Sequence, residues 1–436
     1  MTHHAVSEWG KVAVGSSGGF NVREAEALMA AARAHPLGGE EGSGILTDHR
    51  HHLRARQMVG LLAAPTCSLE ILPKIDPDAP DEHTPTVRAR LVSLIDLALG
   101  LDIGDGQAAA MTHGADNLLE VFIRLFADRL LAQTRRGLPR QYLPCEDDLP
   151  VLRGRLDVNR QFTINAVRPN RLSCHFDVLS HDIALMQVMA ATVVFLAKRT
   201  RVPAIRRSLD ELRFVLSDVT LLPPKTLPWS AVRLDRTNRD WESLFRLASL
   251  LLGREWQATG YDSAGHAGAS LLFPMERLFE DAVAALLRLA MAGSGIEVVA
   301  QGGLKHCLGE WRQDTACEGR VFQTRPDLLL KRRGKVIAVI DTKWKRLSAD
   351  PLDRKHGVSQ ADVYQMMAYA RLYECERLML LYPSMPGTGS SEVRRFGVHG
   401  GREMIALGQV DLANGMQDLQ VGLNNLTRNF VFGMVA

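Results

Sequence analysis

The chain has 436 residues, of which 46% are hydrophobic and 23% are charged, and its formal net charge is only +3. This length and composition predict two or three globular domains with their own cores, and they exclude a disordered, fibrous or strongly polycationic protein. Any surface for nucleic acid must therefore come from local clustering of basic residues.

The spacing of the cysteines and the length of the apolar runs indicate where in the cell the protein is expected. The cysteines form no C-x-x-C pair, so neither a zinc ribbon nor a disulfide framework is expected; they are Cys67, Cys145, Cys174, Cys307, Cys317 and Cys375. The first residues lack the charged-then-apolar layout of a signal peptide. No run approaches the roughly 18 apolar residues of a membrane span. We therefore expect a cytoplasmic protein without a membrane segment.

We expect a small β-rich or mixed domain over residues 1–115, followed by a mainly helical region over 116–255. In the first part, "KVAVG" and "SLEILPKI" (68–75) predict strands and 22–34 predicts a helix. The Gly- and acid-containing stretch at 101–115 is expected to be an irregular break. In the second part, 117–135 has apolar residues at helical spacing, and two or three more helices are expected between 176 and 255.

Residues 256–436 predict an α/β domain with a central mixed sheet flanked by helices. The expected order is a helix at 274–292, a strand at "GIEVVAQ" (295–301), a hairpin, a helix at 359–374 and a strand at 377–383. Pro274 suits the first turn of its helix.

The hairpin lies in the segment "RPDLLLKRRGKVIAVIDTKWK" (325–345). "LLL" and "VIAVI" predict two buried strands, and "KRRG" between them has turn chemistry. Pairing the strands about this turn places Asp327 opposite Asp341 at the open end. Lys343 follows Asp341 by two residues and therefore projects from the same face.

Two carboxylates without a neighbouring His or Cys predict an oxygen-only cation site, with Asp327 and Asp341 as ligands. Such a site suits Mg²⁺, or Mn²⁺ in its place. A lysine beside the cation can orient the attacking water or stabilise negative charge on a phosphate. Glu280, or Glu276, is available as a further acid from the preceding helix. The chemistry that fits is phosphodiester hydrolysis.

The helix that follows strengthens this interpretation. An acid-x-Lys triplet at a strand end is by itself more often structural than functional. Gln365 and Tyr369, however, are four residues apart on one helical face, where they can support the site or contact a nucleic-acid strand. Together with the two aspartates, they favour a functional site.

The combination "RPD…VIDTKWK…QMMAY" resembles the PD-(D/E)xK nuclease superfamily, and its Gln-x-x-x-Tyr element is similar to the RecB-like branch. The wider chain resembles the McrC family, the nuclease subunit of McrBC-type modification-dependent restriction systems. The stretches that support this are "SLEILPKI" (68–75), "RRGLPRQYLPCEDDLPVLRGRLD" (135–157) and "FPMERLFEDAV" (273–283).

The resemblance implies a catalytic trio of Asp327, Asp341 and Lys343, joined by Glu280, in a Mg²⁺-dependent endonuclease. It also implies a McrB-like AAA+ GTPase partner, double-stranded DNA with modified bases as substrate, and an N-terminal region that docks on the motor and stimulates it. The chain has no G-x-x-x-x-G-K-[ST] phosphate loop, so we do not expect it to hydrolyse nucleotides itself.

Basic residues outside the hairpin are candidates for DNA or partner contact. They are Arg135, Arg136, Arg140 and Arg153, together with Lys345 just after the trio. For the arginines, salt bridges to the nearby "CEDDLP" are the competing explanation. "DHRHHLRAR" (48–56) has no common metal-site spacing and is expected to be a solvated basic turn or a partner-facing surface.

Two alternatives remain open at this point. One is a non-catalytic adaptor that activates an AAA+ motor, and the other is a stand-alone DNA-repair or RNA-processing nuclease. A homodimer formed through the nuclease domain also remains open.

Overall fold

The structure is a computed structural model of the chain. It describes residues 2–15, 18–74, 84–112, 117–168, 170–252, 270–311, 313, 318–348, 350, 352–384, 389–412 and 416–432. The chain forms two compact units. Unit 1 comprises Met1–Leu118 and Trp256–Ala436, and unit 2 comprises Leu119–Glu255.

The N-terminal part of unit 1 contains a sheet with strand order β1-β6-β5-β10. Its strands are β1 (Thr2–Ser7), β5 (Met58–Ala63), β6 (Cys67–Leu72) and β10 (Leu271–Pro274). Every residue of β5 and β6 is buried. This agrees with the apolar sequence of β5, whereas in β6 the buried Glu70 is paired with Arg88 at 2.6 Å. Gly60 of β5 has φ 121°, and a Cβ there would lie 1.9 Å from the Leu271 carbonyl oxygen. A glycine is therefore required where β10 pairs with β5.

Helix α1 (Val22–Ala34) packs against this sheet and begins as predicted. Asn21 caps it in a capping box with Glu24. The remaining N-terminal elements are β2 (Lys11–Ala13), η1 (Glu40–Gly42), β3 (Leu46–Asp48), β4 (His52–Ala55), α2 (Thr84–Leu99) and α3 (Asp105–Thr112). Helix α3 corrects the expectation of an irregular break at 101–115. Its run of alanines favours a helix.

The C-terminal part of unit 1 is built on a mixed sheet with strand order β11-β14-β15-β16-β18-β17. The strands are β11 (Ile296–Ala300), β14 (Leu328–Arg332), β15 (Lys335–Thr342), β16 (Arg377–Pro383), β17 (Ser391–Gly397) and β18 (Met404–Val410). β14 and β15 form the predicted antiparallel hairpin, while β15, β16 and β18 run parallel. A separate hairpin joins β12 (Lys305–Glu310) to β13 (Glu318–Thr324).

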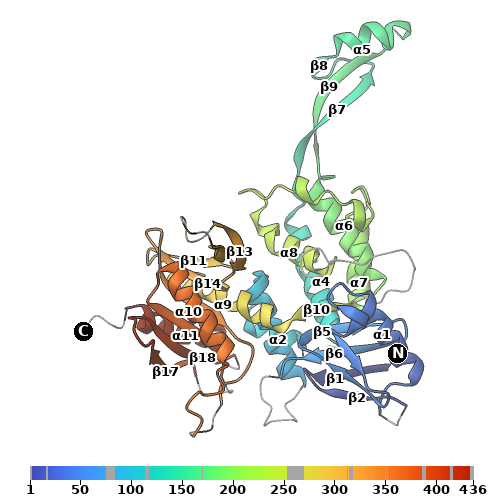
Figure 1. Ribbon diagram of the computed structural model, residues 1–436. Coiled ribbons are helices and arrows are strands. Elements are labelled where there is room, and N and C mark those ends of the chain that lie inside the picture. The colour runs from blue at the N-terminus through green and yellow to red at the C-terminus, as the bar shows by residue number, and fades with distance from the viewer. Residues whose placement is uncertain are drawn as a thin grey trace. The chain divides into compact units, whose positions relative to one another are not determined.

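Helices cover both faces of this sheet (Figure 1). Helix α10 (Gln360–Tyr373) lies on one face, against β15 and β16. Helices α9 (Met275–Met291) and α11 (Met416–Phe432) pack together on the other face. The expectation of a mixed α/β fold is confirmed.

Unit 2 combines helices with an extended β-arm. Its helices are α4 (Leu118–Arg136), α5 (Val158–Thr163), α6 (Ala184–Ala197), α7 (Pro203–Val215) and α8 (Glu242–Leu251), with short turns η2 (Asn165–Val167), η3 (Pro224–Thr226), η4 (Trp229–Ala231) and η5 (Arg239–Trp241). The arm is the antiparallel sheet β7-β9-β8, with β7 (Gln141–Leu149), β8 (Arg155–Leu156) and β9 (Leu172–Ser180) (Figure 1). The expectation of a mainly helical region omitted this sheet.

The domain division at 1–115, 116–255 and 256–436 stays a prediction. In the structure, β10 comes from the third segment but pairs with β5 of the first. Helices α2 and α9, from the same two segments, also pack together. In the described part of the chain, no helix is both long and apolar enough to span a bilayer.

Candidate active site

The strand ends of the β14–β15 hairpin bring the two predicted aspartates together. Leu328 pairs with Ile340, Leu329 with Val339, and Leu330 with Ala338. Asp327 precedes the first of these pairs and Asp341 follows it, so the predicted register is confirmed. At the other end, Arg333 and Gly334 have φ 50° and 79° and form the turn.

Asp327 is fixed across the open end of the hairpin by Thr342. Its Oδ2 accepts hydrogen bonds from the Thr342 backbone nitrogen at 2.7 Å and from Thr342 Oγ1 at 2.8 Å. The Asp327 carbonyl oxygen accepts from the Gln301 nitrogen at 2.8 Å, which ties the residue to the end of β11. These bonds hold the Asp327 carboxylate in place beside Asp341.

Asp341 is a buried carboxylate with one cation beside it. Only 1% of the residue is exposed, and its Oδ2 lies 2.5 Å from Lys343 Nζ. Neither carboxylate oxygen receives a well-aligned hydrogen bond from the described residues, so the contact with Lys343 is an ion pair. Burial and the negative charge of Asp327 raise the pKa of Asp341 to about 6, against the opposing effect of Lys343.

Lys343 remains a cation in this setting. Burial acts to lower its pKa, but the surrounding carboxylates, Asp341 first among them, outweigh burial and raise the pKa. Lys343 Nζ also donates to Gln365 Oε1 at 3.4 Å. An ammonium ion is therefore held at the carboxylates at neutral pH.

The predicted supporting pair on α10 forms a relay that ends on the lysine. Gln365 Nε2 donates to the Tyr369 hydroxyl at 2.7 Å, and that hydroxyl donates to the Arg325 carbonyl oxygen at 3.3 Å. Burial raises the pKa of Tyr369, so the phenol keeps the proton that this bond requires. The relay fixes the Gln365 amide and thereby the place of Lys343.

Glu280 on α9 brings a further acid to the site. Burial and the charge of Asp327 raise the pKa of Glu280 to about 7. Its Oε1 is buried without a hydrogen-bond partner among the described residues. Glu276, the alternative candidate, instead accepts from Gln57 Nε2 at 3.1 Å. Because burial and the charge of Asp327 raise the pKa of Glu280, this residue is the stronger of the two candidates for the further acid.

The oxygen atoms present fit a hard divalent cation. Asp341 Oδ1 and Glu280 Oε1 are buried acceptors that no described donor satisfies. Among the described residues, no three His, Cys, Asp or Glu side chains converge closely enough to enclose a metal ion. Two carboxylates with water in the remaining positions is the arrangement that Mg²⁺ tolerates, since it dehydrates reluctantly.

Trp344, which the sequence analysis did not single out, links this site to the N-terminal sheet. Its Nε1 donates to Glu8 Oε2 at 3.0 Å, and its ring lies 5.4 Å from that of Phe279, the neighbour of Glu280. Glu8 Oε2 also accepts from the Lys74 nitrogen at 3.1 Å. The contact joins residues 336 positions apart, and no local pattern could have indicated it.

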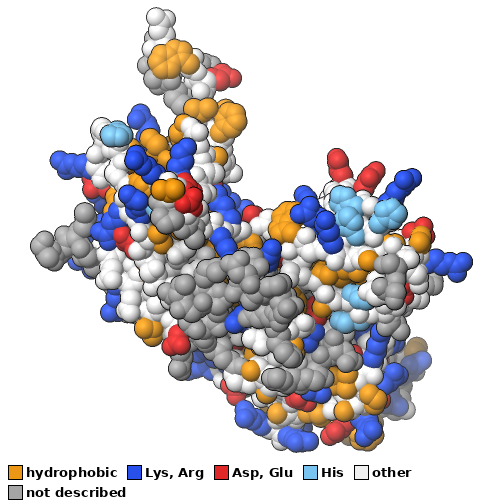
Figure 2. Space-filling model, turned by 90° about the horizontal axis from the view of Figure 1, so that it is seen from below, with side chains coloured by type: hydrophobic (Ala, Val, Ile, Leu, Met, Phe, Trp, Pro, Cys, Tyr) orange, Lys and Arg blue, Asp and Glu red, His pale blue; other side chains and the backbone are white. Residues whose placement is uncertain are grey.

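The basic candidates lie in different surroundings. Arg135, Arg136 and Arg140 are exposed at the end of α4 and before β7. The Arg153 guanidinium stacks 4.3 Å from the Phe176 ring centroid, and Lys345 forms an ion pair with Asp362. On the face drawn in Figure 2, Lys and Arg side chains stand singly or in small groups among acidic and apolar ones.

Glu146 and Asp148, two acids of the stretch "CEDDLP", form ion pairs with residues other than these four arginines. Asp148 pairs with Arg160 at 3.3 Å, and Glu146 pairs with His175 at 3.2 Å. These two contacts do not involve Arg135, Arg136, Arg140 or Arg153, for which salt bridges to this stretch were the competing explanation.

Comparison with known proteins places the chain in a family. A family model described as "McrBC 5-methylcytosine restriction system component" matches residues 53–383, well over half of the chain. The chain belongs to the McrBC family. The resemblance expected from the sequence is confirmed. No curated protein matches the chain.

Two solved structures share the fold of this McrBC-family chain. One is a chain of the refined half-complex from the tetradecameric assembly of Thermococcus gammatolerans McrB AAA+ hexamers with bound McrC. It aligns with a TM-score of 0.71 and 20% identity, over 98% of this chain and 100% of that one. The other is a chain of the cryo-EM structure of the Thermococcus gammatolerans McrBC complex. It aligns with a TM-score of 0.55 and 24% identity, over 67% and 88%.

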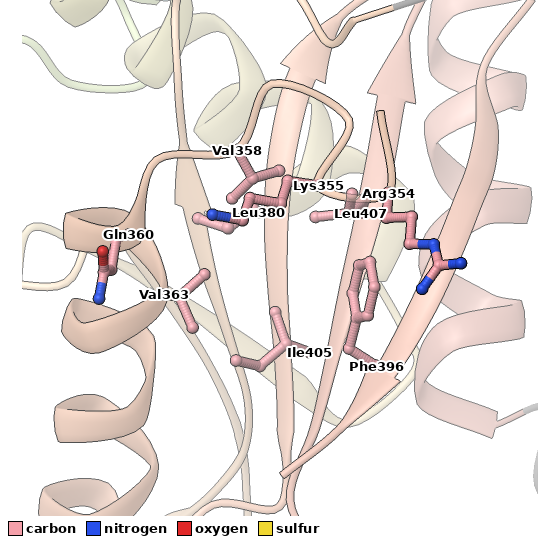
Figure 3. A pocket seen from close by; sticks show the side chains of 9 residues that line it. All are labelled: Arg354, Lys355, Val358, Gln360, Val363, Leu380, Phe396, Ile405 and Leu407. Atoms are coloured by element: carbon pink, nitrogen blue, oxygen red, sulfur yellow. The ribbon is translucent and has the colours of Figure 1, made fainter. Parts of the chain in front are cut away.

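A cavity of about 400 Å³ opens on the α10 face of the same sheet (Figure 3). Leu380, Ile405, Leu407 and Phe396 form its floor, and Arg354 and Lys355 contribute basic side chains. Because Leu380 is the register partner of Asp341, the cavity begins one strand away from the carboxylates. Its lining is mainly apolar and brings no further acid or nucleophile to the site.

Glu8 predicts a pH-dependent stability. Burial raises the pKa of Glu8 from 4.5 to about 7, so its protonated form stabilises the fold. That stability is complete below about pH 4.5 and is lost as the pH rises through 7. Glu8→Gln cannot ionise and keeps an acceptor for Trp344. The free energy of unfolding of this variant relative to wild type should therefore increase between about pH 4.5 and pH 7, by up to about 1.4 kcal/mol per pH unit, and should level off above pH 7.

The exposed Glu26 of α1 offers a matched control. For Glu26→Gln, the difference from wild type should not grow over the same range. A pH-independent difference for Glu8→Gln would show that this carboxyl does not titrate within the fold.

Proposed function

We propose that this chain is a metal-dependent DNA endonuclease subunit of a McrBC-type modification-dependent (type IV) restriction system, with a nuclease domain of the PD-(D/E)xK kind. The observation that supports this most directly is the cluster of Asp327, Asp341 and Lys343, with Gln365 and Tyr369 behind the lysine. Membership of the McrBC family adds independent support.

Each residue has a role that follows from its surroundings. Asp327 and Asp341 would hold Mg²⁺, with Mn²⁺ as a substitute. When bound, the cation lowers the pKa of a coordinated water and neutralises charge on the phosphate. Lys343, kept protonated, orients the attacking water or stabilises negative charge that develops on the phosphate oxygens. Glu280, with a pKa near neutrality, can accept a proton from the water.

The partner we propose is a McrB-like AAA+ GTPase that delivers double-stranded DNA carrying modified bases. The similar solved structure contains McrB AAA+ hexamers with bound McrC, and this chain has no phosphate loop of its own. The β-arm of unit 2, together with α5 and η2, which lie between β8 and β9, is a suitable contact surface. Helix α5 buries none of its residues, and Phe162 and Val167 are 76% and 84% exposed. Exposed apolar side chains grouped in this way mark protein-binding sites.

Isosteric changes at the carboxylate cluster should separate catalysis from folding. Asp327→Asn, Asp341→Asn and Lys343→Gln should each lower DNA cleavage by about 10²–10³-fold or more, because each removes an electrostatic group from the reaction centre. Cleavage of modified DNA with the motor partner present is the measurement. Stimulation of the partner's nucleotide hydrolysis should persist.

Glu276→Gln is the matched control, since this acid lies on the same helix as Glu280 but bonds to Gln57. Its cleavage rate should remain close to wild type. Full cleavage by Asp341→Asn would refute the nuclease assignment at these positions. If wild type does not cleave DNA and all three variants lose stimulation of the partner's nucleotide hydrolysis, the result would favour a non-catalytic adaptor.

Metal dependence can be measured by binding as well as by activity. EDTA should abolish cleavage, and Mg²⁺ or Mn²⁺ should restore it. Mn²⁺ binding followed by electron paramagnetic resonance should weaken in Asp327→Asn and Asp341→Asn, because each loses an anionic oxygen ligand, and should be retained in Glu276→Gln. Unchanged Mn²⁺ binding in both aspartate variants, or stoichiometric zinc in the purified protein, would contradict the proposed site.

The arm should contribute to motor binding and not to chemistry. The double variant Phe162→Ser/Val167→Ser should weaken partner binding by about 10-fold or more, the scale of a truncated hot spot, and should lower GTPase stimulation accordingly. Leu352→Ser, an exposed apolar residue of unit 1, is the control. Equal stimulation by the arm variant and wild type would exclude this surface as the motor contact.

A further inference from the structure

A groove of about 220 Å³ adjoins the carboxylate cluster within unit 1. It is formed by side chains from the end of β1, the end of β6 and the segment after the lysine of the cluster, together with Pro383. We call it the Trp groove, and its other lining residues are Glu8, Trp9, Lys74, Trp344, Lys345 and Arg346. The N-terminal sheet and the nuclease sheet thus share one concave surface.

The chemistry of the Trp groove favours an anion. Lys74, Lys345 and Arg346 contribute three cations; Lys345 is paired with Asp362, and Arg346 is also engaged in a contact. The acid in the lining is Glu8. Its Oε2 already accepts hydrogen bonds from Trp344 Nε1 and from the backbone nitrogen of Lys74. Burial raises the pKa of Glu8 to about 7, so this carboxyl is only partly ionised at neutral pH and cancels only part of the positive charge.

Two further cations lie against Trp9, an aromatic residue that lines the groove. The Arg54 and Arg56 guanidinium carbons lie 5.7 and 4.9 Å from the centroid of the Trp9 ring. Trp9 is 39% exposed and has φ 62°, a left-handed conformation that bulky residues rarely adopt. Arg54 Nε donates to the Trp9 carbonyl oxygen at 3.3 Å and helps to hold it there. The basic stretch 48–56 therefore ends beside the groove.

We propose that the Trp groove binds a backbone phosphate of the DNA strand next to the phosphodiester that is cut. The proposal rests on the nuclease function proposed above. Trp344, Lys345 and Arg346 line the groove and directly follow Lys343, whose Nζ contacts Asp341, so the groove begins at the residue next to the carboxylate cluster. A DNA strand carries a phosphate about every 3.4 Å along the helix axis. A strand at Asp327 and Asp341 therefore has further phosphates within reach of the groove.

The surroundings favour DNA over an acidic protein partner. Cations interleaved with aromatic rings suit a nucleic-acid strand, since arginine and lysine bind phosphates and indole rings stack on bases. The groove also adjoins the groups that would cut DNA, whereas a protein bound there would obstruct them. The N-terminal region consequently contributes to substrate binding in addition to any role in motor docking.

The salt dependence of DNA binding by the full chain tests this directly. Binding of a labelled short duplex is followed by fluorescence anisotropy in EDTA, so that no strand is cut. Lys74→Gln and Arg346→Gln should each weaken binding about 5- to 10-fold, and each should reduce the slope of log K against log salt by about 1. Lys335→Gln is the matched control, since it is exposed at the opposite end of β15 from Asp341.

Cleavage kinetics with the motor and Mg²⁺ supply the second readout. The two groove variants should raise KM about 5- to 10-fold and leave kcat nearly unchanged, because a binding contact is lost and the reacting groups are intact. A purely structural role would leave the salt slope at its wild-type value.

Each outcome decides between the two proposals. If wild type cleaves DNA but both variants keep its salt slope and KM, the groove proposal is overturned and the nuclease stands. Absence of salt-dependent duplex binding by wild type also overturns it. Unchanged DNA binding with lost GTPase stimulation would make the groove a protein contact and overturn it as well. If wild type binds DNA through these residues but never cleaves, the nuclease proposal fails and the groove remains a DNA site.

Discussion

The ion pair between Asp341 and Lys343 is the interaction on which the candidate site depends. A carboxylate that is 1% exposed would be costly to ionise without a cation, and Lys343 lies 2.5 Å from it. Burial first, and then the negative charge of Asp327, raises the pKa values of Asp341 and Glu280, and one ammonium does not offset both effects. A divalent cation would relieve this repulsion, so the electrostatic imbalance of the site is itself suited to metal binding.

The N-terminal sheet helps to position that site. β10 pairs with β5 and ends at Pro274, which is the N-cap of α9. Glu280 lies in the second turn of α9, about 9 Å along the axis from this cap. From the other side, the Glu8–Trp344 hydrogen bond holds the residue after Lys343. Both Glu280 and Lys343 are thus anchored to residues of the first 118, and the N-terminal region is an integral part of the unit that carries the candidate site.

Much of the site was predictable from sequence because its parts interact locally. A short turn and two apolar runs predict the hairpin, and a bulge between Leu330 and Lys331 shifts the register by one residue, so that Asp327 lies opposite Asp341. Helical spacing likewise places Gln365 and Tyr369 on one face. The arm sheet was missed for a physical reason. β7 has the sequence QYLPCEDDL and buries none of its residues, so it lacks the apolar alternation that predicts a strand.

Contacts between residues that are far apart in the sequence could not be predicted in this way. Lys74 belongs to the stretch "SLEILPKI", which carries the family resemblance, yet its place beside Arg346 depends on how two sheets pack. Trp9 and Arg56 likewise meet only through the pairing of β2 with β4. With a net charge of only +3, a DNA surface must be assembled from such distant cations. A sequence motif can therefore indicate the chemistry of the candidate site, whereas the DNA surface that we propose beside it is a property of the folded chain.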